Sequence, residues 1–420
     1  MGISIQDSSG SDARASSSTS ADPIKADSLA DYAVFLETVR SDYDRAEAMY
    51  ERAIAADPNH AYTLRHYAVF FETVRRDYDR AQEMYERAIK IDPANAHGLG
   101  NYADFLERAR RDYSRAQEMY ERAIKADPAN AIHLRNYARF LRHVRRDYSR
   151  AQEMYERAIK ADPANAYTLR IYAVFLETVI HDYDRAEEMY ERAIKADPAN
   201  AYGLGNYADF LERARRDYSR AQELYERAIA ADPNHAYTLR NYARFLVVVR
   251  RDYDRAEEMY ERAIAADPTD ARNLGNYARF LVVVRRDYDR AEAMFERAIE
   301  ADPNRADNIG GYALFLEKFR RDYGRAEEMY ERAIAADPTN AAMLGVYAVF
   351  LEKVRCDYGR AEAMFERAIA ADPANAHGLS NYADFLETAR RDYDRAEAMY
   401  ERAIAADPTD ARNLGNYARF

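Results

Sequence analysis

Residues 58–92 read PNHAYTLRHYAVFFETVRRDYDRAQEMYERAIKID, and close variants of this stretch recur throughout the chain. All twelve prolines lie in Asp-Pro dipeptides spaced 35 residues apart, from Pro23 to Pro408. A period of this size indicates one supersecondary unit stacked on copies of itself, because a single copy cannot bury its own apolar face. The 420 residues are therefore expected to form a solenoid instead of the roughly three globular domains that length alone suggests.

Each copy contains two runs of apolar residues spaced for helices. The first run places residues three and four positions apart, at Ala61, Leu64, Tyr67, Ala68, Phe71 and Val74. The second run does the same, at Tyr78, Ala81, Met84, Tyr85, Ala88 and Ile89. Asp77 lies between the runs, where its carboxylate can cap the second helix, and Pro93 disfavours helical conformation at Asp92. The copy is predicted to form a helix, a tight turn, a helix and another tight turn.

Small and aromatic residues predict how the helices pack. Ala68, Ala81 and Ala88 recur in every full copy, and they allow neighbouring helix axes to approach closely. The tyrosines and Phe70 fill the gaps between the helices. We expect the buried tyrosine hydroxyls to reach water or backbone carbonyls.

The string Asp77-Tyr78-x-x-Ala81-x-x-x-Tyr85-x-x-Ala88-x-x-x-Asp92-Pro93 resembles the second helix and turn of a tetratricopeptide repeat. The likeness covers residues 23–420, in eleven full copies and a partial one. The first helix departs from the family pattern at Leu64, Tyr67 and Ala68. One extra residue near Arg76 makes this repeat longer than the family's, which predicts a longer turn between the helices.

This resemblance implies an all-α fold, a right-handed superhelical α-solenoid of about eleven antiparallel helix pairs. Two other repeat families share part of this pattern. The run Tyr85-Glu86-Arg87-Ala88 resembles the half-a-tetratricopeptide repeats of RNA-processing scaffolds. The period matches that of pentatricopeptide repeats, which read RNA bases, but their residue pattern fits poorly.

The two ends of the sequence differ from the repeats. Residues 1–22 are rich in serine, and we expect a disordered tail there; a tail carrying O-linked modification is the alternative. At the other end, the last copy stops at Phe420, within its first helix. Either the chain is a fragment of a longer array, or its end contacts another copy and the chains assemble end to end into a filament.

Composition argues against several classes of protein. A net charge of −11 makes nucleic acid an unlikely partner, and no apolar run is long enough for a membrane span. No signal peptide is seen; the compartment is unknown, with the cytoplasm weakly favoured. The scattered histidines, the single Cys356 and the lack of a Gly-rich phosphate motif predict no metal, no cofactor and no enzymatic activity.

The copies differ from one another mainly in the first helix, at places equivalent to residues 62, 65, 66, 69, 72 and 73. Arg65, Val69 and Glu72 share one helix face, opposite the packing stripe. In tetratricopeptide proteins that face lines a concave peptide groove, and the resemblance implies the same here. The groove candidates are Arg135, Arg139, Arg142, Arg170, Arg240, Arg244, Val247, Val248, Arg279, Val282 and Val283. Asp104, Asp209 and Asp384 interrupt them with negative charge.

Four valines stand out on this face, because exposed helix faces usually carry polar residues there. Val247, Val248, Val282 and Val283 predict an apolar patch flanked by arginines, and duplication of one altered copy is the alternative explanation. We therefore expect a non-catalytic protein-interaction scaffold, with an acidic peptide held by arginine–carboxylate pairs as a candidate ligand. A self-assembling structural protein is the second hypothesis, and an RNA-binding repeat protein is the third.

Overall fold

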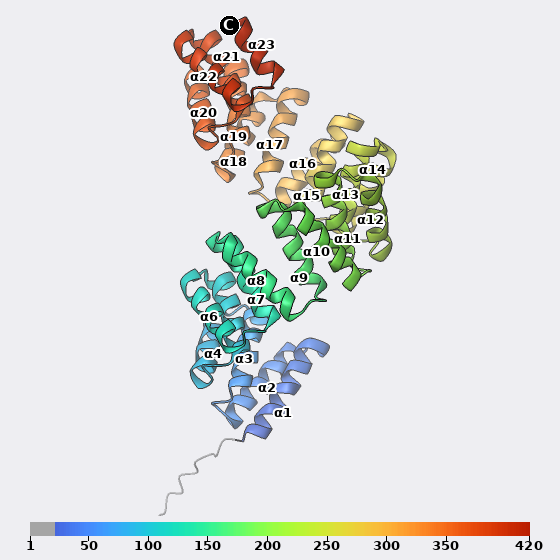
Figure 1. The fold of residues 1–420 in the computed structure, drawn as a ribbon, viewed down its shortest axis with the longest axis vertical. Coiled ribbons are helices and arrows are strands. Elements are labelled where there is room, and N and C mark those ends of the chain that lie inside the picture. Colours follow the sequence, from blue (N-terminus) through green and yellow to red (C-terminus); the bar gives the residue numbers. More distant parts are fainter. Residues whose placement is uncertain (1–21) are drawn as a thin grey trace, which may run out of the picture. The chain divides into compact units, whose positions relative to one another are not determined.

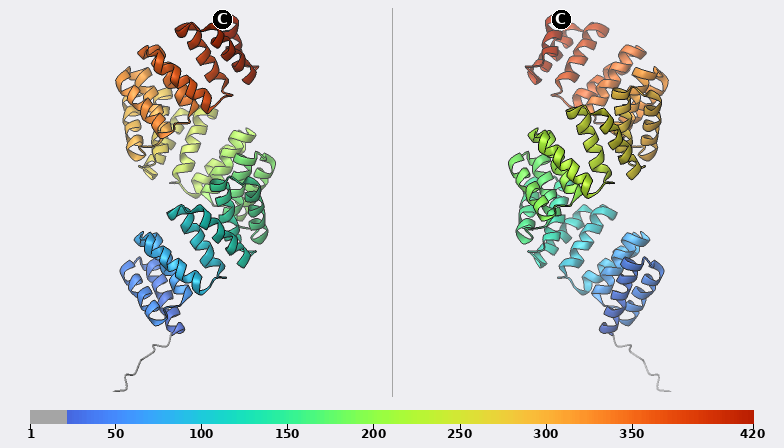
Figure 2. Two further views of the ribbon diagram at one scale, coloured as in Figure 1. Left: turned by 90° about the vertical axis from the view of Figure 1, so that its left-hand side faces the viewer. Right: turned by 90° about the vertical axis from the view of Figure 1, so that its right-hand side faces the viewer.

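The computed structural model describes residues 22–420, all of whose regular elements are helical. The predictions of a disordered or modified tail over residues 1–22 therefore fall outside the described residues, except at Asp22, which caps the first helix. The chain divides into two units, Met1–Asp197 and Pro198–Phe420. Within each unit, antiparallel helix pairs follow one another side by side (Figures 1 and 2). The predicted all-α solenoid of helix pairs is confirmed.

The first unit holds five helix pairs among its described residues. Its first helices are α1 (Pro23–Phe35), α3 (Ala61–Phe70), α5 (Ala96–Phe105), α7 (Ala131–Phe140) and α9 (Ala166–Phe175). These continue into π-helical segments, Leu36–Arg40, Phe71–Arg75, Leu106–Arg110, Leu141–Arg145 and Leu176–Ile180. Its second helices are α2 (Tyr43–Ala56), α4 (Tyr78–Ile91), α6 (Tyr113–Ala126), α8 (Tyr148–Ala161) and α10 (Tyr183–Ala196).

The second unit holds six pairs and a last helix, α23 (Ala411–Arg419). Its first helices are α11 (Ala201–Phe210), α13 (Ala236–Phe245), α15 (Ala271–Phe280), α17 (Ala306–Phe315), α19 (Ala341–Phe350) and α21 (Ala376–Phe385). Their π-helical segments are Leu211–Arg215, Leu246–Arg250, Leu281–Arg285, Leu316–Arg320, Leu351–Arg355 and Leu386–Arg390. Its second helices are α12 (Tyr218–Ala231), α14 (Tyr253–Ala266), α16 (Tyr288–Ala301), α18 (Tyr323–Ala336), α20 (Tyr358–Ala371) and α22 (Tyr393–Ala406).

The connection between the two helices of a pair is shorter than the sequence suggested. After α3 the chain widens into a π turn, and the Phe71 carbonyl accepts hydrogen bonds from the amides of both Arg76 and Asp77. Arg76 has a left-handed backbone (φ 56°), and Asp77 then caps α4 by accepting from the Arg80 amide at 3.0 Å. Because a π turn contains more residues than an α turn, the extra residue of this repeat fits inside the helix end and does not lengthen the loop.

The core is built from the residues that the periodicity indicated. Ala68, Ala81 and Ala88 are buried, and so is Phe70. Aromatic rings join successive pairs, as where Tyr225 of α12 lies 5.4 Å, centroid to centroid, from Tyr242 of α13. Burial of these rings removes apolar surface from water at every junction, which is the main force that holds one pair on the next.

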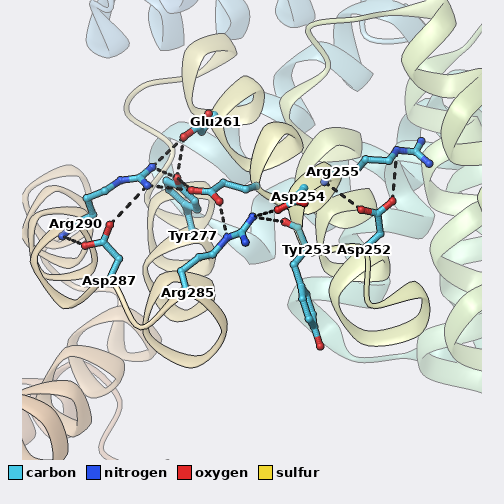
Figure 3. Close-up of polar contacts among 10 residues, drawn as sticks. Asp252, Tyr253, Asp254, Arg255, Glu261, Tyr277, Arg285, Asp287 and Arg290 are labelled. Carbon is cyan, nitrogen blue, oxygen red and sulfur yellow. Dashed lines mark hydrogen bonds and ion pairs between the residues drawn. The ribbon is translucent and has the colours of Figure 1, made fainter.

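A recurring polar contact, here called the outer clamp, also fastens neighbouring pairs (Figure 3). The Tyr277 hydroxyl on α15 donates to Glu261 on α14 at 3.0 Å, and Arg290 on α16 donates to the same carboxylate at 2.9 Å. Equivalent clamps are Glu86–Tyr102–Arg115, Glu121–Tyr137–Arg150, Glu156–Tyr172–Arg185, Glu226–Tyr242–Arg255, Glu296–Tyr312–Arg325, Glu331–Tyr347–Arg360 and Glu366–Tyr382–Arg395. The expectation that tyrosine hydroxyls reach water or carbonyls is wrong for these residues, because nearby carboxylates are stronger acceptors.

Candidate ligand groove on the first helices

A second polar contact, here called the inner set, joins three elements on the side of the first helices. Glu212 follows α11, Tyr225 lies on α12, and Arg244 lies on α13. The Tyr225 hydroxyl donates to Glu212 at 3.2 Å, and Arg244 donates to both oxygens of that carboxylate at 2.9 and 3.0 Å. Arg244 also pairs with Asp209 at 2.8 Å. One carboxylate therefore satisfies a phenol and a guanidinium that belong to different helix pairs.

Burial makes the inner set sensitive to any change in its members. The Glu212 side chain is only 5% exposed. Burial raises the pKa of Glu212, and the Arg244 charge acts in the opposite direction. Burial likewise raises the pKa of Tyr225 well above its usual value. A carboxylate in such a place is kept by its donors, because an unpaired buried charge costs several kcal/mol, on the order of 3 to 5.

We call the contact between two successive helix pairs a junction. The inner set recurs in full at one junction of the first unit and in part at another of the second unit. In the first unit, Glu107 accepts from the Tyr120 hydroxyl at 2.7 Å and from Arg139 at 3.0 Å, and Asp104 also contacts Arg139. In the second unit, Glu387 accepts from Tyr400 at 2.8 Å, and Arg419 pairs with Asp384 at 3.2 Å. At each of these junctions the arginine lies on the first helix of a pair. The preceding copy carries Asp and Glu at the places of the two inner-set carboxylates.

At one junction the tyrosine and arginine donors of the inner set are present, but a valine replaces the glutamate. Val247 stands where Glu212 stands one copy earlier, and Tyr260 and Arg279 occupy the places of Tyr225 and Arg244. Within residues 22–420, no carboxylate forms an ion pair with Arg279 and no group accepts from the Tyr260 hydroxyl; the Arg279 guanidinium contacts the amide oxygen of Asn276. These residues line a cleft of about 350 Å³, here called the donor cleft, with Arg244, Phe280, Val283 and Val284.

The donor cleft is electropositive. Arg279 is exposed at its edge, and partial desolvation by the surrounding protein lowers its pKa, although Asp307 partly offsets this effect. Burial raises the pKa of Tyr260 to about 12, and the charges of Arg244, Arg279 and Arg240 act against that rise. At neutral pH the cleft therefore presents a cation and a protonated phenol, both of which donate hydrogen bonds.

At the next junction all three places are apolar. Val282, Phe295 and Leu314 replace the Glu, Tyr and Arg of the inner set, and they line a cleft of about 310 Å³, here called the apolar cleft. Phe315 and Phe319 complete its wall, and Phe319 is 44% exposed. Gly311 keeps the cleft open, because a Cβ atom there would lie 3.3 Å from the Phe295 ring.

A third cleft, here called the polar cleft, lies on the other side of Arg244. It measures about 420 Å³ and is lined by Asp209, Arg213, Tyr237, Arg240, Asn241 and Arg244. Arg240 is only 6% exposed, and it donates to Asn273 at 3.1 Å beside the Tyr237 ring. Burial lowers the pKa of Arg240, and Asp270 acts in the opposite direction.

The three clefts adjoin one another. The polar and donor clefts share Arg244, and the donor and apolar clefts share Arg279 and Val283. Together they form what we call the inner groove, which runs across α11, α13, α15 and α17 of the second unit. Figure 1 labels these four helices.

Models of known repeat families match most of the sequence. One described as "TmcB, TPR repeats" matches residues 43–98, 99–163, 148–202 and 208–273, and two described as "Tetratricopeptide repeat" match residues 250–307, 281–341 and 357–411. The chain belongs to the tetratricopeptide repeat family. Tetratricopeptide arrays serve in general as protein-interaction scaffolds, because stacked helix pairs present extended binding surfaces.

Solved tetratricopeptide-like structures share this fold at low sequence identity. The crystal structure of yeast Tom70 is 16% identical, with 94% of each chain covered and a TM-score of 0.50. A monomeric IFIT1 mutant with m7Gppp-AAAA is 15% identical, with 92% of this chain and 96% of that chain covered and a TM-score of 0.51. At this identity the likeness establishes the fold alone. A search of curated proteins found no significant match.

Seven of the residues predicted for the tetratricopeptide groove lie in the second unit. Arg240, Arg244, Val247, Arg279, Val282 and Val283 line the three clefts. Val248, by contrast, is 64% exposed and lines none of them. The valines also differ from one another, because Val282 is 7% exposed and Val283 is 75% exposed. Val247 and Val282 therefore lie in the cleft walls and Val283 at their exposed rim, whereas Val248 lies outside the clefts.

Sequence reasoning missed several residues of this groove. It did not include Tyr260, Phe295, Gly311, Leu314 and Phe319, which line the donor and apolar clefts. A signal for some of them was present in the copies. Phe295 stands where most copies have tyrosine, and Gly311 stands where the preceding copy has Asn276.

The other four predicted residues lie in the first unit, where protein groups already hold them. Arg139 pairs with Asp104 and Glu107, and Arg142 donates to the Thr178 hydroxyl at 3.1 Å. Arg135 and Arg170 both lie against the Tyr167 ring, at 4.8 and 5.1 Å from its centroid. All four are also less exposed than Arg279.

No group of three or more metal-ligating side chains gathers within residues 22–420. Over the same residues, every helix is too short or too polar to cross a membrane. Cys356 is exposed and takes the left-handed place between two helices that arginine occupies in most copies.

Proposed function

We propose that the chain is a non-catalytic protein-interaction scaffold and that a peptide segment of its partner lies along the inner groove. The observation that carries this proposal is the continuity of the three clefts through Arg244, Arg279 and Val283. Each cleft has the volume of one or two side chains. A run of such clefts suits a peptide that seats successive side chains in them, as helices and extended segments do in grooves.

Local charge favours an acidic segment as the ligand. The whole chain carries a net charge of −11. The groove, however, is lined by five cations and one carboxylate: Arg213, Arg240, Arg244, Arg279 and Lys318, against Asp209. A positive groove attracts an acidic segment even on a protein whose net charge is negative.

Peptide binding can be located with isotope-labelled valine methyl groups. Peptides selected from a random phage-displayed library on the full-length chain should shift the methyl signals of Val247, Val283 and Val284. Val283→Glu should abolish binding, because it adds a carboxylate to the rim shared by the donor and apolar clefts. Val39→Glu is the matched control, because Val39 is also exposed but lies in the first unit.

Two results would contradict the proposed function. One is a selected peptide that binds Val283→Glu as tightly as the unaltered chain. The other is a set of shifts confined to residues outside the inner groove. Either would place the ligand on another surface of the array.

Self-assembly and RNA binding stay alternative hypotheses. Light scattering over a wide concentration range tests the first, since a mass near 48.4 kDa at every concentration contradicts a filament. Titration with a single-stranded RNA at low salt tests the second, because phosphate contacts are strongest there.

A further inference from the structure

Other copies of the repeat show what the tyrosine and arginine donors of the donor cleft bind when a carboxylate is present. In the inner sets, the carboxylates of Glu107 and Glu212 each accept from a tyrosine hydroxyl and from an arginine of the next pair. Tyr260 and Arg279 come from the same places in the repeat. Val247 supplies only an isopropyl group where those copies have the carboxylate.

We propose that the donor cleft binds a glutamate or aspartate side chain of the peptide ligand, and that the apolar cleft binds a large apolar side chain close to it in the same peptide. This inference rests on the proposed function, since it names the chemistry of the ligand in the inner groove. The ligand carboxylate takes the place that Glu212 has in the preceding junction, and it accepts from Tyr260 and Arg279.

The charge of the donor cleft matches a single carboxylate. Arg244 lines the cleft, but Asp209 and Glu212 already pair with it. Arg279 is then the one arginine of the cleft without a carboxylate partner within residues 22–420. One guanidinium and one phenol suit a monoanion with two oxygens, and a dianionic phosphate would keep charge that nothing in the cleft balances.

The apolar cleft next to the donor cleft requires an apolar side chain in the peptide ligand. Phe295, Leu314 and Phe315 replace or flank the polar members of the inner set, so the wall of this cleft is apolar except at Arg279 and Lys318. Gly311 leaves room above the Phe295 ring. Because Arg279 and Val283 belong to both clefts, the acidic and apolar side chains must lie within a few residues of each other in the peptide.

The most informative variant introduces at the donor cleft the glutamate that other copies have at this place. Val247→Glu should bring a carboxylate to Tyr260 and Arg279, and the folded protein should melt at a higher temperature as a result. The same variant should weaken an acidic peptide by about tenfold or more, because the internal carboxylate competes for both donors. Val248→Glu is the matched control: it adds the same charge one residue away, on a side chain that lies outside the clefts.

The probes are fluorescein-labelled synthetic peptides, each with one Glu and one Phe separated by zero to three serines, and their Gln counterparts. Fluorescence anisotropy with the full-length chain measures their affinity, and the valine methyl signals report where they bind. We expect Glu peptides to bind about tenfold more tightly than Gln peptides. Arg279→Gln should remove that preference, and Val248→Glu should reduce the affinity by less than threefold, roughly the effect of one exposed charge.

The outcomes distinguish failure of the carboxylate site from failure of the proposed function. Equal affinity for Glu and Gln peptides, with shifts at Val247 and Val283, overturns the carboxylate site and leaves the proposed function standing. Phosphoserine that binds more tightly than Glu at the same position also overturns it. If none of the peptides shifts these signals at millimolar concentration, the carboxylate site fails, and if selected library peptides fail as well, so does the proposed function.

Discussion

The junction between residues 209 and 244 and the junction between residues 244 and 279 are built alike on one side and differently on the other. On the outer side, both have the same clamp of glutamate, tyrosine and arginine. On the groove side, Glu212 joins a tyrosine to an arginine in the first junction. In the second, Val247 leaves Tyr260 and Arg279 facing a cleft.

The comparison shows how a tandem array separates stacking from binding. Outer clamps and buried rings hold neighbouring pairs in place, so the groove side can change without loss of the fold. A glutamate there closes the junction with a contact inside the chain. A valine at the same place leaves the same donors facing a cleft, and three apolar residues line the cleft at the next junction.

Glu212→Val would make the first junction resemble the second, and it carries the largest expected effect. The Tyr225 hydroxyl loses its acceptor, and Arg244 keeps only Asp209. We expect the free energy of unfolding to fall by about 3 kcal/mol. Urea unfolding followed by circular dichroism measures the change.

Glu352→Val is the matched control for this substitution. Glu352 is buried to the same degree, but its second-helix neighbour is Phe365, and its ion pair is with the exposed Lys353. A loss below about 1 kcal/mol is expected there. Equal losses at both positions would show that burial alone, and not the inner set, determines the cost.

Removal of one hydroxyl at each junction sharpens the comparison further. Tyr225→Phe leaves the buried Glu212 carboxylate without one of its donors, so we expect a loss of about 1.5 kcal/mol. Tyr260→Phe should cost less than about 0.5 kcal/mol, because no protein group within residues 22–420 accepts from that hydroxyl. The same unfolding experiment compares them, and a larger loss at Tyr260 would reveal an acceptor inside the chain.

Addition of a hydroxyl to a phenylalanine should change the free energy of unfolding by about 1 kcal/mol or less. Phe295→Tyr places a phenol beside Val282 and Leu314, and should cost about 1 kcal/mol. Phe365→Tyr places one near Glu352, and the Tyr330–Glu317 pair one copy earlier has the same arrangement at 2.6 Å. That variant should be stabilised by about 0.5 kcal/mol. Midpoints of urea unfolding that move in the same direction for both variants would contradict this.

Much of the fold could be predicted from single copies. The spacing of apolar residues predicted both helices, and Asp77 was correctly predicted to cap the second helix. The turn between the helices was predicted too long, because the sequence does not show that the helix end widens to include the extra residue. The hydroxyl partners were also missed, since Tyr277 and Glu261 lie 16 residues apart and meet only when pairs stack.

The groove was predicted in outline and not in detail. Comparison of copies identified the variable face and most of the arginines and valines that line the clefts. It treated Val248 and Val283 alike, although only Val283 borders the clefts. It also predicted Arg139 and Arg279 as equivalent groove residues. Carboxylates of the chain form ion pairs with Arg139 but not, within residues 22–420, with Arg279.

The sequence by itself determined the repeat, its helix pairs, their caps and the face on which copies differ, because each of these follows from spacing within one copy. Tertiary structure decided which side chains of different copies meet. Glu212, Tyr225 and Arg244 form one contact although the glutamate is 13 residues from the tyrosine and 32 from the arginine. Only the stacking of pairs brings those positions together, and with them the junction where Arg279 faces a cleft without a carboxylate of its own.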